Sequence, residues 1–294
     1  DLLGLGMLDA LEQAIPMIRV HEGVDLDLAH LPADDDPTYE MIRAADTAGV
    51  FQIESRAQMA SLPRNQPRNF YDLVVQVAII RPGPIAGNIT NPYLERRQGR
   101  EAVTYPHPSL EPVLERTLGV PLFQEQLLRM AMEAAGFSGG EAEELRRAMG
   151  FKRSTERMRA IETRLREGMR SRGIGAEAQE EIVRSITSFA LYGFPESHAA
   201  SFALIVYASA YLKAHHPTAF YVSLLNAWPM GFYHPATLVK DAQRHGVEAR
   251  YRYGNAVTGF AADDVLARRG ARACSGGAGD RWRRRMASCS WRGA

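Results

Sequence analysis

The sequence has little cysteine: its 294 residues include two, Cys274 and Cys289, both near the C-terminus. The main body of the chain therefore has neither a disulfide framework nor cysteines at zinc-binding spacing. No apolar run approaches the roughly 18–20 residues that cross a bilayer, and the first residues lack the charged-then-apolar layout of a secretory signal. We expect a cytoplasmic protein with no zinc site and no membrane contact.

Strand patterning is also scarce, whereas helical periodicity and helix-ending residues recur along most of the chain. With 46% hydrophobic and 23% charged residues, the chain is expected to fold as one large or two medium domains. We predict a mainly α protein. Residues 199–226 are expected to form two apolar helices, the first of which ends at His215 and His216, before Pro217, with no ligand role for either histidine.

The acidic stretch at residues 34–36 precedes another expected helix. Asp36 followed by Pro37 is typical of an N-cap with proline at the first helical position, and Glu40 follows in the first turn. Three adjacent aspartates also suggest a metal site, but neighbouring side chains on an extended loop point in different directions. We favour the cap.

An apolar run at residues 70–80 is followed directly by a proline-rich run at residues 81–93. Residues 70–80 are predicted to form a buried helix or strand, because periodicity does not distinguish the two in so short a segment. Residues 81–93 contain three prolines and two glycines, and we expect them to form an irregular loop.

Positive charge is concentrated in one segment, although the net charge is only +1. Residues 143–172 carry ten Lys or Arg against five Asp or Glu, and they include Arg146 and Arg147 before Gly150 and a further Lys-Arg pair after it. Cations near a helix C-terminus complement its dipole, so ordinary capping explains the cluster. The same side chains suit phosphate oxygens, and the local pattern leaves both interpretations open.

The composition changes after about residue 250. Residues 270–294 mix Gly, Ala, Ser, Arg, Cys and Trp without a periodic apolar face, and they contain one acid against many arginines. We expect residues 249–294 to be disordered. Out-of-frame translation of GC-rich DNA would give this composition, and a basic arm that binds nucleic acid is the alternative.

Five stretches carry a family resemblance over roughly residues 1–247. They are GVFQIESRAQM at 49–59, AIIRPGPIAG at 78–87, GVPLFQEQLLRMA at 119–131, ELRRAMGFKRS at 144–154 and YGFPESHAASFALIVYASAYLKAHHP at 192–217. In this order and spacing they resemble the alpha subunit of bacterial DNA polymerase III. Residues 224–247 are more similar to the error-prone paralogue of damage-induced synthesis than to the main replicase, which is the alternative.

The resemblance implies a domain organisation. Residues 21–248 correspond to the helical fingers domain, which closes over the incoming nucleotide, residues 1–20 to the end of the palm, and residues 249–294 to no part of the family. The opening DLLGLGML resembles the palm motif that contains the third catalytic aspartate, so Asp1 is implied to be catalytic and to bind metal. Since one carboxylate does not hold two magnesium ions, we expect the chain alone to bind substrate without catalysing transfer.

The resemblance also implies residues that bind the nucleotide. Arg146 and Arg147 are implied to contact the incoming triphosphate, with Lys152 as a helper. Adjacent helix residues diverge by about 100°, so we expect the two arginines to have different partners, one phosphate and the other an acid or the template strand. The remaining matches to family motifs near the nucleotide are Arg81, Gly83, Phe123, Ser197 and His198.

Each of these weaker matches has a structural alternative. Arg81 and Gly83 can equally belong to a purely structural loop, and Ser197 can cap a helix against which His198 packs. Phe123 stands where many relatives have tyrosine, so a stacking or steric role is implied but none for a hydroxyl.

The implied function is that of a fragment of an error-prone DNA-directed DNA polymerase, a nucleotidyltransferase of replication and translesion repair after DNA damage. Its implied partners are primer–template DNA and dNTP, with Mg²⁺, the sliding clamp and other mutasome proteins in the complete polymerase. The alternatives are a non-catalytic helical module that binds nucleic acid and a degraded gene fragment without activity.

Overall fold

The structure, a computed structural model, describes residues 2–80, 86–150, 155–189, 194–228 and 233–247. Regular secondary structure in these ranges is helical, apart from an isolated parallel β-bridge between Phe123 and Phe194. The predicted mainly α fold is therefore confirmed for the described chain. The expected disordered tail at residues 249–294 lies outside it.

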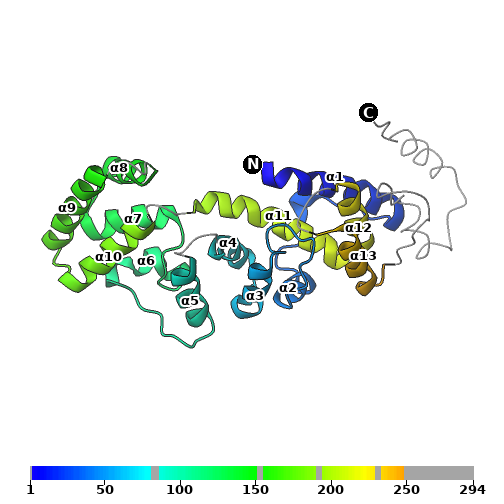
Figure 1. The fold of residues 1–294 in the computed structure, drawn as a ribbon, viewed down its shortest axis with the longest axis horizontal. Coiled ribbons are helices and arrows are strands. Elements are labelled where there is room, and N and C mark those ends of the chain that lie inside the picture. The colour runs from blue at the N-terminus through cyan, green and yellow to red at the C-terminus, as the bar shows by residue number, and fades with distance from the viewer. Residues whose placement is uncertain (1, 81–85, 151–154, 190–193, 229–232, 248–294) are drawn as a thin grey trace, which may run out of the picture.

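The helices form two lobes, each with its own apolar core (Figure 1). The terminal lobe contains α1 (Leu2–Glu22), η1 (Leu28–His30), α2 (Asp36–Arg43), α3 (Arg56–Asn65), α4 (Phe70–Ile79), α5 (Ala86–Arg97), α11 (Glu196–His215), α12 (Pro217–Asn226) and α13 (Pro235–Arg244). The inserted lobe contains η2 (Pro108–Leu110), α6 (Glu111–Leu114), η3 (Glu115–Thr117), α7 (Gln124–Ala135), α8 (Gly139–Gly150), α9 (Thr155–Ser171) and α10 (Ala176–Phe189). The chain thus leaves the terminal lobe after α5 and returns to it at α11.

The helix α11 is the centre of the terminal lobe and packs against α1, α2, α4 and α12. As expected from the sequence, it ends at His215, and α12 begins at Pro217. The two histidines at this boundary pair with acids: His215 Nε2 lies 2.7 Å from Asp35 Oδ2, and His216 Nδ1 lies 2.6 Å from Glu22 Oε2. These contacts connect the end of α11 to α1 and α2.

The cap of α2 is one residue earlier than predicted. Asp35, not Asp36, is the N-cap: its Oδ2 accepts hydrogen bonds from Thr38 N at 3.0 Å and from Thr38 Oγ1 at 2.6 Å. Asp36 is the first helical residue, and Pro37 follows it. The same Asp35 carboxylate binds His215, so a tertiary contact favours Asp35 over its neighbour.

The apolar run at 70–80 and the proline-rich run after it are both largely helical. Residues 70–79 form α4, which is capped by Asn69, whose Oδ1 accepts from Asp72 N at 3.0 Å. The expected irregular loop is wrong from residue 86 onward, because α5 begins at Ala86 and continues through Pro92. Tyr93 and Leu94 are each 1% exposed, so burial in the terminal core outweighs the cost of the proline. Residues 81–85 lie outside the described chain.

In the inserted lobe, α9 passes very close to the end of α7. A Cβ atom added to Gly168 of α9 would lie 2.1 Å from the carbonyl oxygen of Ala135. Because backbone atoms cannot move aside as a flexible side chain can, only glycine fits at this point.

We predict that Gly168→Ala lowers the free energy of unfolding by about 1–3 kcal/mol, although alanine is the better helix former, because the added methyl overpacks the α7–α9 contact. Chemical denaturation measures the change. The control is Gly140→Ala in α8, where the nearest atom is 4.0 Å away, and we expect its free energy of unfolding to be unchanged or higher by up to about 1 kcal/mol. Equal stability of the two variants would contradict the proposed packing.

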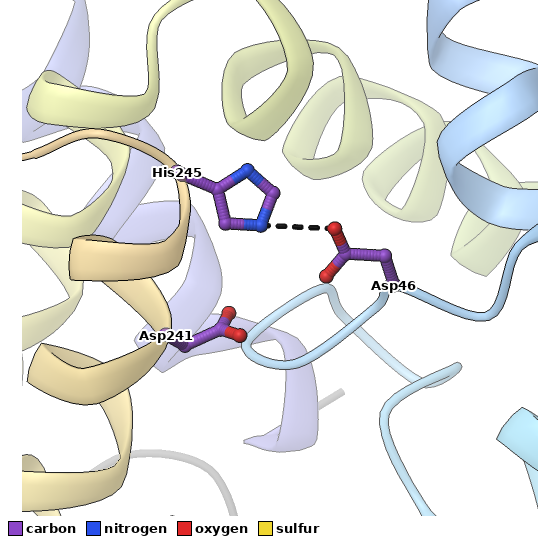
Figure 2. Close-up of side chains that lie close together, drawn as sticks. All are labelled: Asp46, Asp241 and His245. Atoms are coloured by element: carbon purple, nitrogen blue, oxygen red, sulfur yellow. Dashed lines mark ion pairs between the residues drawn. The ribbon is translucent and has the colours of Figure 1, made fainter.

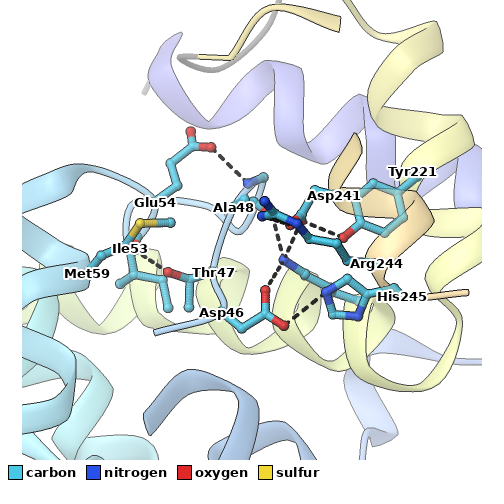
Figure 3. A network of polar contacts seen from close by, with 12 residues as sticks. Asp46, Thr47, Ala48, Ile53, Glu54, Met59, Tyr221, Asp241, Arg244 and His245 are labelled. Atoms are coloured by element: carbon cyan, nitrogen blue, oxygen red, sulfur yellow. Dashed lines mark hydrogen bonds and ion pairs between the residues drawn. The ribbon is translucent and has the colours of Figure 1, made fainter. Parts of the chain in front are cut away.

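A buried ammonium group connects three segments of the terminal lobe, and Figure 3 labels its partners Asp46, Ala48 and Asp241. Lys213 of α11 is 0% exposed, and its Nζ lies 3.0 Å from Asp46 Oδ1, 3.0 Å from Asp241 Oδ2 and 3.1 Å from the Ala48 carbonyl oxygen. Tyr221 Oη donates a hydrogen bond of 2.7 Å to the same Asp241 oxygen. Burial raises the pKa of the Asp46 carboxyl, but the charges and hydrogen bonds of Lys213 and His245 outweigh burial, so that pKa lies below its usual value.

We predict that Lys213→Met lowers the free energy of unfolding by about 3 kcal/mol, because it leaves the Asp46 and Asp241 carboxylates without their shared cation. Thermal or chemical denaturation measures the change. Lys240→Met, at an exposed position of α13, removes the same charge and should stay within about 0.5 kcal/mol of the parent. If both variants lose the same stability, the Lys213 network has no special role.

Candidate functional site

The two arginines at residues 146 and 147 lie in the last turns of α8. The helix begins with a capping arrangement in which Ser138 N donates to Glu141 Oε2 at 2.8 Å. One side of α8 is apolar and buried, with Ala142, Leu145 and Ala148 all below 5% exposure. Arg146 and Arg147 are on the other side, with 51% and 71% of their side chains exposed.

Both guanidinium groups contact a single carboxylate, that of Glu143. Arg146 binds it in a two-bonded fork, with Nε to Oε2 and Nη2 to Oε1 both at 2.7 Å. Arg147 Nε donates to Oε1 at 3.1 Å. Hydrogen bonds from Arg146 and then Arg147 lower the pKa of the Glu143 carboxyl to about 2, so the cluster is fully charged at neutral pH.

Arg146 and Arg147 therefore share one acid, whereas the sequence led us to expect different partners for them. Although adjacent helix residues point about 100° apart, positions three and four residues after an acid are both its neighbours on the helix surface. Glu143 is three residues before Arg146 and four before Arg147, a spacing visible in the sequence. An acidic partner for one of the two arginines was predicted, but the prediction did not identify it as Glu143, which binds both.

Other arginines of the basic segment also have partners within the inserted lobe. Arg164 donates to Glu144 at 2.9 Å and to Glu141 at 2.6 Å, and Arg166 pairs with Glu162 and Glu180. These bonds connect α9 to α8 and α10. Part of the positive charge of the segment therefore stabilises helix packing.

The predicted residues of α11 and its surroundings lie at the start of that helix. His198 lies between two aromatic rings that are tilted relative to its own, with centroid distances of 5.2 Å to Phe194 and 4.2 Å to Phe202. Ser197 is exposed, but it is not the cap, because the N-cap is Pro195 and the helix begins at Glu196. His198 thus packs against neighbouring rings, as in the structural alternative, whereas Ser197 does not cap the helix as that alternative proposed.

Phe123 is fully buried in the terminal core. It forms the β-bridge with Phe194, next to the ring of His198. The structure therefore groups Phe123 with Ser197 and His198 near the start of α11, while Arg146 and Arg147 lie on α8 of the other lobe. Asp1, Arg81, Gly83 and Lys152 are outside the described residues.

One group of side chains among the described residues has metal-ligand chemistry: Asp46, Asp241 and His245 (Figure 2). Their ligand atoms lie within 4.8 Å of one another, and His245 Nε2 is 2.9 Å from Asp46 Oδ2. The Lys213 ammonium already lies between the two carboxylates, at 3.0 Å from each. This group therefore does not fit a magnesium ion. No local sequence pattern indicates the group, because Asp46 lies almost 200 residues before Asp241 and His245.

No helix of the described chain is both long and apolar enough to cross a lipid bilayer.

The comparisons with known proteins all indicate the same family. The model of the bacterial DNA polymerase III alpha subunit finger domain matches residues 7–173. The chain is 59% identical over 259 residues to the error-prone DNA polymerase of Anaeromyxobacter dehalogenans, covering 85% of this chain and 23% of that protein. It is 57% identical over 248 residues to the error-prone DNA polymerase of Mycobacterium tuberculosis, with 84% and 23% covered. The corresponding protein of Nocardia farcinica is 58% identical over 248 residues, with 84% and 22% covered.

These matches extend through both lobes, and the chain spans less than a quarter of the length of these curated relatives. The family model covers more than half of the chain, from α1 into the residues just after α9. A helical chain with the RPGP, QEQ and LRRAMG motifs in family order, matched at this level, belongs to the bacterial DNA polymerase III alpha subunit family and carries its finger domain.

Proposed function

We propose that this chain is the finger region of an error-prone, DNA-directed DNA polymerase, and that it binds the incoming dNTP against primer–template DNA. The observation that carries the proposal is the cluster at the end of α8, where Arg146 and Arg147 share the exposed carboxylate of Glu143. A triphosphate offers several oxygens with the same geometry and more negative charge than one carboxylate. It can therefore displace Glu143 and take over both guanidinium groups.

The domain assignment is part of the same proposal. Residues 21–248 are the fingers, residues 1–20 correspond to the edge of the palm, and residues 249–294 lie outside the family. The boundary at residue 20 falls within α1, which packs against α11 and α12. In a complete polymerase, this continuous helix would connect the finger domain rigidly to the palm.

We also propose roles for the remaining family-matched residues. Lys152 assists the two arginines, Ser197 and His198 lie near the nucleotide, and Arg81 and Gly83 let the backbone approach the nucleotide or primer terminus. The exposure of Ser197 supports its part of this proposal. Phe123 acts sterically from the core, beside its bridge partner Phe194.

Magnesium belongs to the complete polymerase in this proposal, with Asp1 among its ligands. The described residues do not provide its site, since their one candidate group, Asp46 with Asp241 and His245, already contains the Lys213 ammonium.

In the complete protein we further propose translesion synthesis after DNA damage, a cytoplasmic location, and the sliding clamp and other mutasome proteins as partners. The names of the relatives support the error-prone part of this proposal.

The test is a chimera in which residues 1–247 replace the matching segment of the Anaeromyxobacter dehalogenans polymerase. We predict that Arg146→Ala combined with Arg147→Ala lowers kcat/KM for single-nucleotide incorporation by at least about tenfold, because the triphosphate loses its two planar donors. The matched control replaces Arg170 and Arg184, two exposed arginines of the same lobe, by alanine. Unchanged incorporation by the Arg146 and Arg147 variant would refute the assignment.

Glu143→Gln tests the competition between carboxylate and phosphate. In the absence of nucleotide, the Glu143 carboxylate binds both guanidinium groups and so competes with the triphosphate for them. A neutral amide competes less, and we predict that it lowers the KM for dNTP by roughly twofold to fivefold in the same chimera. Glu162→Gln, which removes a partner of Arg166 in α9, is the control and should leave the KM unchanged. A higher KM for Glu143→Gln would mean that Glu143 orients the arginines instead of competing for them.

The alternative, a non-catalytic module that binds nucleic acid, gives a different binding result. Nucleotide-stimulated binding of labelled primer–template by the chain supports the polymerase proposal. Binding that is sensitive to salt but unaffected by nucleotide supports the alternative.

A further inference from the structure

The two lobes are joined at a narrow junction. The chain enters the inserted lobe between α5 and η2 and returns before α11, and the segment just before α7 pairs with this return crossing, where Gln124 N donates to the Phe194 carbonyl oxygen at 3.1 Å. The apolar cores on the two sides form separate clusters. A cavity of about 490 Å³ opens at the junction and is lined by Phe70, Tyr71, Arg116 and Glu196, among others. The lobes therefore do not merge into one core there.

A chain of polar contacts crosses this junction beside the cavity. The guanidinium carbon of Arg116, at the end of the inserted lobe's η3, lies 3.5 Å from the ring centroid of Tyr71 in α4 of the terminal lobe. Tyr71 Oη donates to Glu196 Oε1 at 3.0 Å. At the start of α11, Glu196 N donates to Glu125 Oε2 of α7 at 2.9 Å, which leads back to the inserted lobe.

Each contact suits its position. A guanidinium group over an aromatic face is attracted by the ring's negative quadrupole. The Glu125 carboxylate accepts from a free amide at the N-terminus of α11, where the helix dipole favours negative charge. Burial and then the Glu196 carboxylate raise the pKa of the Tyr71 hydroxyl, so Tyr71 keeps its proton and remains a donor.

Gln126 has a separate role, because it shapes the segment before α7 that pairs with the return crossing. Its Oε1 accepts from Leu122 N at 2.8 Å and from Phe123 N at 3.0 Å, and its Nε2 donates to Thr117 Oγ1 at 2.8 Å. These partners belong to that segment and to η3, the short helix before it. The contacts of Arg116 and Glu125, in contrast, connect the inserted lobe to α4 and α11.

We propose that Arg116, Tyr71, Glu196 and Glu125 form an inter-lobe clamp that sets the angle between the inserted and terminal lobes. The four are positioning residues. Because Arg146 and Arg147 are on the inserted lobe and Ser197 and His198 are on the terminal lobe, the clamp fixes how the two groups face a shared nucleotide. That last consequence rests on the proposed function, whereas the clamp itself does not.

The clamp is tested by distances between spin labels on the two lobes, measured by double electron–electron resonance without nucleotide. The labels are attached at Glu12→Cys in α1 and Glu167→Cys in α9, both exposed, after Cys274→Ser and Cys289→Ser. We expect a single distance population in this background. In Arg116→Leu we expect a second population, because the lobes can then adopt another angle.

The matched control is Arg164→Leu, which removes an arginine 5.4 Å from the Phe137 ring, a contact within the inserted lobe. It should keep the single population of the background. An unchanged distribution in folded Arg116→Leu would overturn the clamp. If circular dichroism shows that Arg116→Leu does not fold, Tyr71→Phe decides: it keeps the ring but loses the bond to Glu196, and a single unchanged distance would again overturn the proposal.

Discussion

The charge balance at the end of α8 is the interaction on which this account depends. Two guanidinium groups share one exposed carboxylate, so more donors are present than Glu143 can satisfy. The excess leaves the cluster ready to accept a group with more oxygens and more charge. The apolar side of α8 makes this arrangement possible, because it fixes the helix on the inserted core and leaves the arginines exposed.

The two-lobe construction gives this cluster its context. The inserted lobe has its own core, and the chain returns from it to the terminal lobe beside the segment that precedes α7. A close backbone approach at Gly168 makes the inserted lobe compact, and the buried Lys213 ammonium stabilises the far part of the terminal lobe. Each lobe is thus held by contacts of its own, and the junction can determine their relative angle.

Much of the fold followed from the sequence where periodicity was long and the helix ends were marked. Residues 199–226 were correctly expected to be two helices, because His216 and Pro217 break a strongly apolar run. The state of residues 70–80 was left open, although the Asn69 cap and Asp72 in the first turn favoured a helix. Pro92 suggested a loop, but burial of Tyr93 and Leu94, which depends on tertiary packing, kept the segment helical.

The candidate site was less predictable, because its partners depend on distance in space. Arg146 and Arg147 were found by family motif and Glu143 could have been found by helical spacing. The Lys213 network joins residues almost 200 positions apart, and the contact of Arg116 with Tyr71 joins two lobes. No local pattern encodes either of them.

The most direct measurement is a structure of the complete polymerase with primer–template DNA and a non-reactive dNTP analogue. The account predicts that Arg146 or Arg147 donates hydrogen bonds to phosphate oxygens and that Glu143 has moved away from at least one of them. Bound nucleotide with both arginines still paired to Glu143 and remote from the phosphates would contradict it.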